Sequence, residues 1–163
     1  DPVLFLEHKG LYRKVQAKAM EPDADYMIPF GKGRVRREGR DLTIVTWGST
    51  VYVALEVARQ LEMEGRSIEV IDLRTLAPLD EQLIYRSVRK TSRVVIVHED
   101  SLTGGFGGEI AARIAENVLD SLDAPMVRVA AKDTFVPAAP SLEQLLLPST
   151  EGLRAAIERV LRY

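Results

Sequence analysis

The residues best suited to chemistry lie in one short segment, from His98 to Glu109. This segment holds an imidazole, two adjacent carboxylates, two hydroxyls and four glycines, just before a run with helical spacing. Glycine lets backbone N–H groups approach a ligand closely, and the first turn of a helix favours anions. Thr103, Gly104 and Gly105 could therefore bind a small anion. The glycine spacing does not match Gly-x-Gly-x-x-Gly, which disfavours a nucleotide, and the alternative is a loop that packs tightly under a neighbouring element.

His98 is a candidate general base, because the ordinary pKa of an imidazole suits proton transfer near neutral pH. Glu99 follows it directly. Neighbouring residues of a strand point to opposite faces, so Glu99 is not expected to orient the imidazole. The alternative for His98 is a hydrogen-bonded histidine at a strand end or an interface. Ser101 lacks the Gly-x-Ser-x-Gly turn that exposes a nucleophilic serine, which disfavours nucleophilic catalysis.

Asp72 and Arg74 form a second candidate pair. They lie two residues apart at the end of a predicted strand, so on an extended backbone they share a face. Ligands of open α/β sheets usually bind beyond the carboxyl ends of the strands. The two side chains could pair with each other, bind a ligand or contact a second subunit, and the simplest of these alternatives is an ion pair.

Composition excludes several classes of protein. The 163 residues carry 22 basic and 24 acidic side chains, and this balance does not favour nucleic acid as a partner. The chain has no cysteine, which excludes disulfides, thiolate catalysis and zinc–thiolate sites and fits a cytoplasmic location. Two histidines are too few for a multi-histidine metal site, so no metal ligands are predicted. No apolar stretch approaches the ~20 residues of a membrane helix. The chain begins with Asp1 rather than methionine, and we expect a further segment upstream.

Apolar spacing predicts alternating strands and helices from Asp41 onward. Strands are expected at 42–47, 68–73, 93–98 and 126–130, with a helix after each of them. Such alternation indicates an α/β fold with a largely parallel sheet and helices on both faces. Before it, Val3–Glu7 is predicted to be a buried strand, and the proline- and glycine-containing stretch 14–40 is predicted to be a surface linker that includes one short strand.

Several segments together resemble a known family. They are Leu-Glu-His-Lys-Gly-Leu-Tyr-Arg at 6–13, Ile-Pro-Phe-Gly-Lys-Gly at 28–33, Asp-Leu-Thr-Ile-Val-Thr-Trp-Gly at 41–48, Asp-Leu-Arg-Thr-Leu-Ala-Pro-Leu-Asp at 72–80, and Asp133-Thr134 through Pro140 with Leu-Glu at 142–143 and Leu-Pro at 147–148. In this order they resemble the second half of the beta subunit of thiamin-diphosphate-dependent 2-oxo acid dehydrogenases, which act on pyruvate, branched-chain 2-oxo acids or acetoin. The opening segment looks closest to the branched-chain members.

The resemblance implies a domain plan. Residues 1–12 would be the last strand of a truncated pyrimidine-binding domain, 13–38 a linker, and 39–163 a transketolase C-terminal-like domain. That domain is a three-layer α/β sandwich whose mostly parallel sheet has one antiparallel edge strand. The family's cofactors are thiamin diphosphate and magnesium, which the missing domain and the alpha subunit would bind. The resemblance therefore implies no catalytic residue and no bound cofactor in this polypeptide, which alone would be inactive.

The resemblance also implies partners. They are a second beta subunit, an alpha subunit and the lipoyl acyltransferase core of a multienzyme complex. Docking candidates are Arg159, Arg162 and Tyr163, near the end of the last predicted helix, whose apolar positions could equally serve core packing alone. Two other functions stay open: a stand-alone anion-binding module built on the 103–108 loop, and the same domain of a transketolase or deoxyxylulose phosphate synthase.

Overall fold

The computed structural model of the protein describes residues 2, 4, 6–12 and 20–163. Within this part five strands form one sheet in the order β1-β3-β2-β4-β5. β2 to β5 pair in parallel, and β1 runs antiparallel to β3 at one edge, as expected. The strands are β1 (Arg34–Arg37), β2 (Leu42–Thr46), β3 (Ile68–Asp72), β4 (Val94–Ser101) and β5 (Val127–Ala131).

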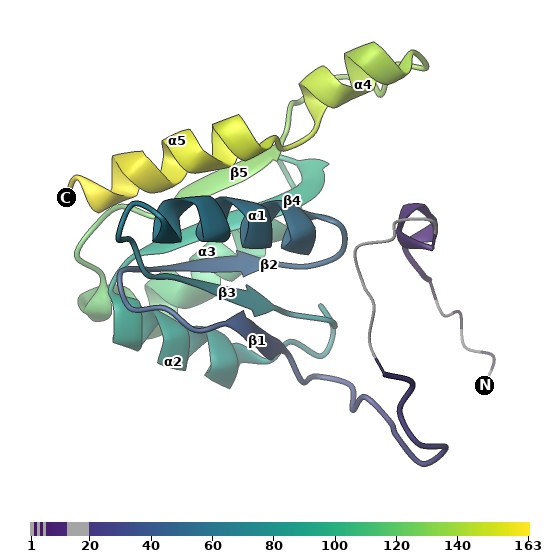
Figure 1. Ribbon diagram of the computed structural model, residues 1–163, viewed down its shortest axis with the longest axis horizontal. Helices are drawn as coiled ribbons and strands as arrows, with labels where there is room; N and C mark the ends of the chain where they lie inside the picture. The colour runs from purple at the N-terminus through teal and green to yellow at the C-terminus, as the bar shows by residue number, and fades with distance from the viewer. Residues whose placement is uncertain (1, 3, 5, 13–19) are drawn as a thin grey trace.

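Helices cover both faces of this sheet and complete the predicted three-layer sandwich (Figure 1). α1 (Thr50–Glu62) and α5 (Thr150–Leu161) pack on one face, whereas α2 (Glu81–Thr91) and α3 (Phe106–Val118) pack on the other. α4 (Pro140–Leu146) stands away from the sheet, and two short 3-10 turns are η1 (Lys9–Leu11) and η2 (Leu119–Ser121). None of the helices in the described residues is long and apolar enough to cross a membrane.

The alternation of side chains along β4 decides which residues face which layer. Val95 and Val97 belong to the core beneath α1 and α5, while Val94 and Ile96 belong to the core beneath α2 and α3. Since the side chains of a strand alternate, His98 continues the α3 side and Glu99 the α1 side. The alternation therefore places the side chains of His98 and Glu99 on opposite faces of the sheet.

Side-chain caps mark the starts of α2 and α5. Asp80 caps α2 by accepting the Leu83 N–H at 3.2 Å, and Ser149 caps α5 by accepting the Gly152 N–H at 3.1 Å. α1 begins directly after Ser49, but Ser49 makes no side-chain capping bond to this helix. Its hydroxyl donates instead to Glu99.

The segment before the regular fold differs in part from its prediction. The expected strand Val3–Glu7 falls partly on residues 3 and 5, which lie outside the described part, and Leu4 and Leu6 belong to no strand. The short strand expected between 14 and 40 is β1. α4 was not expected, and it begins at Pro140 because a proline at the first helical position loses no hydrogen bond.

Candidate functional site

The sequence candidates divide between opposite edges of the sheet. Thr46 pairs with Asp72 on one side and Val97 on the other, so β2, β3 and β4 end at about the same level. Asp72, His98 and the loop that follows β4 therefore lie at the carboxyl edge, where open α/β sheets bind ligands. The exposed docking candidates, Arg159, Arg162 and Tyr163, close α5 at the opposite edge (Figure 1).

His98 is completely buried at this carboxyl edge. Its ring stacks on Trp47 with centroids 5.1 Å apart and planes 7° from parallel. A Cβ atom added to Gly107 would lie 2.2 Å from His98 Nε2, and one added to Gly105 would lie 2.9 Å from the ring. The glycines thus bring the start of α3 into direct contact with the imidazole, which is the tight packing that the sequence offered as the alternative to an anion site.

Neither ring nitrogen of His98 has a hydrogen-bond partner among the described residues. The hydrogen-bonded histidine considered from the sequence is therefore not found; Trp47 stacks on the ring, and the turn at Gly105 and Gly107 packs against it. Burial lowers the pKa of His98, with the nearby Asp100 opposing and Arg128 reinforcing that shift. Burial thus disfavours the protonated imidazole and shields the ring, which does not favour a general base that must reach a substrate.

Glu99 points to the other face and joins two segments that are far apart in sequence. It accepts a hydrogen bond from the Ser49 hydroxyl, and its Oε2 lies 2.8 Å from His8 Nε2. Both donors meet the carboxylate rather than each other. The cluster therefore lacks the contact between the Ser49 hydroxyl and the His8 imidazole that nucleophilic catalysis would require. Its structural effect is to hold the segment of η1 against the ends of β2 and β4.

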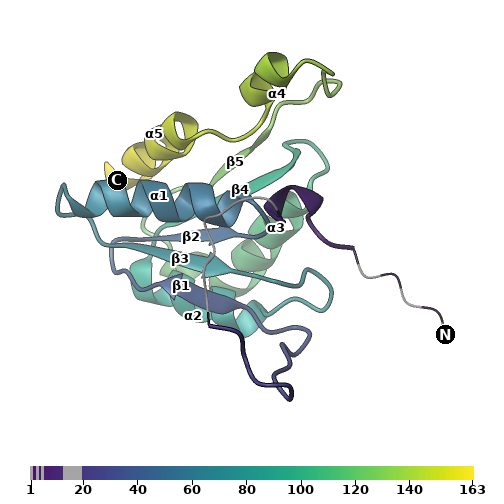
Figure 2. The same ribbon diagram turned by 45° about the vertical axis from the view of Figure 1, so that its right-hand side comes forward.

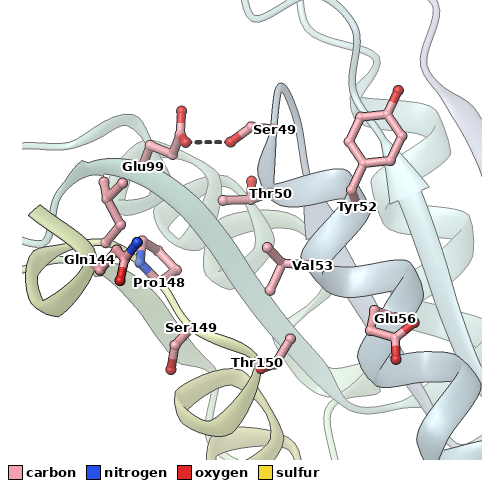
Figure 3. Close-up of a pocket in the computed structure, with 11 residues that line it drawn as sticks. Ser49, Thr50, Tyr52, Val53, Glu56, Glu99, Gln144, Pro148, Ser149 and Thr150 are labelled. Carbon is pink, nitrogen blue, oxygen red and sulfur yellow. Dashed lines mark hydrogen bonds between the residues drawn. The ribbon is translucent and has the colours of Figure 1, made fainter. Parts of the chain in front are cut away.

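A cavity of about 460 Å³ opens beside Glu99, between the start of α1 and the connection from α4 to α5 (Figure 3). Its walls are polar near Ser49 and Ser149 and apolar at Val53 and Pro148. The full lining comprises Ser49, Thr50, Tyr52, Val53, Glu56, Glu99, Gln144, Leu147, Pro148, Ser149 and Thr150.

The loop proposed for anion binding already holds a carboxylate of the same chain. Asp133 accepts hydrogen bonds from the Thr103 backbone N–H at 3.0 Å and from the Thr103 hydroxyl at 2.6 Å. These bonds, the hydroxyl first, lower the pKa of Asp133. Gly104 adopts a left-handed backbone, with φ of 75°, next to them. The Thr103 N–H and hydroxyl, which an external anion would use, thus already donate to Asp133, just after the end of β5.

The ion pair expected between the side chains of Asp72 and Arg74 is not found. Arg74 has φ of 59°, so the backbone leaves the extended conformation that would have placed both side chains on one face. Asp72 Oδ1 instead accepts the Arg74 backbone N–H at 3.1 Å, and Oδ2 lies 3.5 Å from a guanidinium nitrogen of Arg36. Arg74 itself borders a mostly apolar groove of about 810 Å³ that also includes Tyr26 and Phe30.

The described residues offer no group of three or more His, Cys, Asp or Glu side chains placed to bind a metal ion. No step of a reaction is assigned to these residues. What the carboxyl edge can do is bind and position segments of protein.

Three contributors to this edge escaped the sequence analysis. Trp47 lies two residues after Val45, so the alternation of side chains along a strand places both on the same face of the sheet. That pattern could have placed Trp47 on the side of the sheet that His98 faces. Asp133 stood out only as part of a family segment. His8 lies 91 residues from Glu99, so no local pattern could have joined them.

Comparison with known protein families supports the resemblance seen in the sequence. The profile described as transketolase, C-terminal domain, matches residues 31–153. The chain is 41% identical, over its whole length and 50% of the relative, to the 2-oxoisovalerate dehydrogenase subunit beta of Bacillus subtilis. It is 40% identical, over 49% of the relative, to the pyruvate dehydrogenase E1 component subunit beta of Staphylococcus epidermidis. The chain thus spans about half the length of these curated relatives.

Solved structures resemble the same fold. A split gene transketolase, described as an inactive beta4 tetramer, superposes with a TM-score of 0.73 at 33% identity, covering 86% of this chain and 44% of the other. A transketolase from Pichia stipitis reaches a TM-score of 0.58 at 16% identity over 81% of this chain and 18% of its own, which supports the fold alone.

Proposed function

The chain belongs to the transketolase C-terminal domain family, and on that premise we propose that it is the C-terminal half of the beta subunit of a 2-oxo acid dehydrogenase. The complete enzyme would oxidatively decarboxylate a 2-oxo acid and transfer the acyl group to lipoamide. This portion would serve the assembly of the subunits. The observation that carries the proposal is the identity of about 40% to dehydrogenase beta subunits along the entire chain.

The geometry of the carboxyl edge fits an assembly role. Its polar groups are engaged with other segments of the chain: Glu99 with Ser49 and His8, and Asp133 with Thr103. The exposed apolar side chains at this edge suit contact with protein rather than with a small polar substrate. Branched-chain specificity and a cytoplasmic location belong to the same proposal.

Thiamin diphosphate and magnesium would act in the full assembly, held by residues outside this polypeptide. Isothermal titration of the chain with thiamin diphosphate and magnesium is expected to give no binding heat. Tight binding by this chain alone would contradict the placement of the cofactor residues elsewhere.

The proposed partners are a second beta subunit, an alpha subunit and a lipoyl acyltransferase core. A second copy is supported by the 33% identical split gene transketolase, whose description is a beta4 tetramer. Arg159, Arg162 and Tyr163 are the proposed docking residues for the acyltransferase, since all three are exposed at the end of α5.

The test is an affinity purification of the protein from its source cells, with bound proteins identified by mass spectrometry. Recovery of a thiamin-diphosphate alpha subunit together with a lipoyl acyltransferase is expected. Recovery of neither would overturn the assignment. An Arg159→Glu, Arg162→Glu variant should lose the acyltransferase and keep the alpha subunit.

A further inference from the structure

The cavity beside Glu99 has a charge pattern that selects among possible ligands. Its volume of about 460 Å³ falls in the range of small-molecule sites. It lies on the side of the sheet that α1 and α5 cover, where the chain passes from α4 to α5 (Figures 2 and 3). Within the described residues its lining has two carboxylates, Glu56 and Glu99, and no lysine, arginine or histidine. A cavity lined by charges of one sign attracts the opposite sign, so this lining disfavours an anion and favours a cation.

The two carboxylates differ in their capacity to bind a further group. Both oxygens of Glu56 accept hydrogen bonds from the Arg59 guanidinium, at 3.2 and 2.9 Å, so the charge of Glu56 is already compensated. Glu99 has the Ser49 hydroxyl and the His8 imidazole as its partners in the described part of the chain. A carboxylate offers about four lone-pair sites, and 37% of the Glu99 side chain remains exposed. Glu99 is therefore the carboxylate that can receive a further donor.

The surroundings of Glu99 suit an ammonium group with a short aliphatic body. The Ser49 hydroxyl donates its proton to Glu99, and its oxygen can still accept a hydrogen bond. The Gln144 amide, on the α4 side of the cavity, offers a further acceptor oxygen (Figure 3). Val53 and Pro148 form apolar walls beside these acceptors, and methylene groups pack on such walls while the charged end stays on the polar groups.

We propose that this cavity binds a small aliphatic primary amine, with its ammonium group on Glu99 and its hydrocarbon chain between Val53 and Pro148. A free amino acid or a 2-oxo acid fits less well, because its carboxylate would meet Glu99 with no basic side chain in the lining. The inference goes beyond the proposed function and does not depend on it. Since the lining comes from α1, β4 and the connection between α4 and α5, the bound amine would join these segments.

The test is an NMR titration of the isotopically labelled full chain with butylammonium chloride. Sodium chloride, butanol and butyrate are titrated in parallel, as controls for ionic strength, for the aliphatic body and for the opposite charge. Saturable shifts of the Ser49 and Gln144 backbone amide signals are expected with butylammonium alone. Absence of saturable shifts, or equal shifts with butanol, butyrate or sodium chloride, would overturn the proposal.

The length of the amine tests the apolar walls. Each methylene group removed from water should strengthen binding about fourfold, so butylammonium should bind more tightly than methylammonium. Equal dissociation constants for the two amines would refute the placement of the hydrocarbon chain between Val53 and Pro148.

A charge variant tests the anchor. Glu99→Gln keeps a carbonyl that can accept the Ser49 hydroxyl and removes the charge, so the affinity for butylammonium should fall about tenfold or more. Glu116→Gln is the matched control, because Glu116 is exposed on α3, which covers the other face of the sheet, and the affinity should not change. An equal loss in both variants would reduce the effect to net charge and overturn the site. If circular dichroism showed Glu99→Gln to be unfolded, the comparison of butylammonium with butanol on the wild type would still decide.

A lysine side chain carries the same ammonium group as a free amine. Nα-acetyl-lysine N-methylamide is therefore titrated as well. Binding no tighter than that of butylammonium supports a free amine as the ligand. Tighter binding would assign the ammonium group to a protein side chain and overturn the small amine.

Discussion

Replacing Gly107 by alanine tests whether the contact between α3 and His98 limits the fold. The new Cβ would lie 2.2 Å from Nε2 and 2.5 Å from Cδ2 of His98, far inside van der Waals contact. His98 has no room to withdraw, because Trp47 stacks on its ring and the side chain is fully buried.

Two opposing effects determine the size of the change. Alanine favours a helix over glycine by at most about 1 kcal/mol, whereas overpacking a core costs about 1–3 kcal/mol. We therefore expect Gly107→Ala to lower the free energy of unfolding by about 1–2 kcal/mol. For a chain of this size that lowers Tm by roughly 2–8 °C.

Gly108→Ala is the matched control one residue further along α3. The nearest atom to its new Cβ is the end of the Arg128 side chain, at 3.3 Å, which is flexible and can shift. This variant should be as stable as the wild type or slightly more so. The assay is urea unfolding followed by the fluorescence of Trp47, the single tryptophan. If Gly107→Ala proved as stable as Gly108→Ala, the tight packing of α3 on His98 would be refuted.

Three further predictions concern single groups. Burial lowers the pKa of His98, so the imidazole of the unfolded chain binds a proton more tightly than that of the folded chain. The contribution of His98 to the free energy of unfolding should therefore be full above about pH 6.5 and decrease below it. Urea unfolding at pH 7.5 and 5.5 should show a smaller decrease in the free energy of unfolding for a His98→Gln variant than for the wild type. Thr103→Val removes the hydroxyl bond that contributes most to lowering the pKa of Asp133, so an NMR titration should find that pKa raised toward its ordinary value, and an unchanged pKa would contradict the assigned cause. Asp80→Ala should lower the free energy of unfolding by about 1–2 kcal/mol, which is more than Ser149→Ala should. The reason is that Asp80 accepts hydrogen bonds from the Gly33 N–H and the Leu83 N–H, whereas Ser149 accepts only from the Gly152 N–H. Equal losses in urea unfolding would contradict a stabilising role for the bond from Gly33.

The layered fold could be predicted because it depends on local patterns. Apolar runs of strand length alternate with helical spacing from residue 41 onward, and Asp80 and Ser149 mark helix starts by their own side chains. The antiparallel edge came from the family resemblance. α4 was missed, since the prolines at 137 and 140 suggested an irregular connection and a proline at the first helical position looks the same in sequence.

What the sequence determined by itself was the order of strands and helices, the helix caps at Asp80 and Ser149, and the opposite directions of His98 and Glu99, because each follows from the spacing of neighbouring residues. Only the tertiary structure decided the partners of those side chains. Glu99 meets His8 across 91 residues, Asp133 takes the place of an external anion on Thr103, and Arg74 turns away from Asp72. These contacts depend on which loops the sheet brings together at its carboxyl edge. The spacing of residues along the chain carries no information about which distant loops become neighbours there.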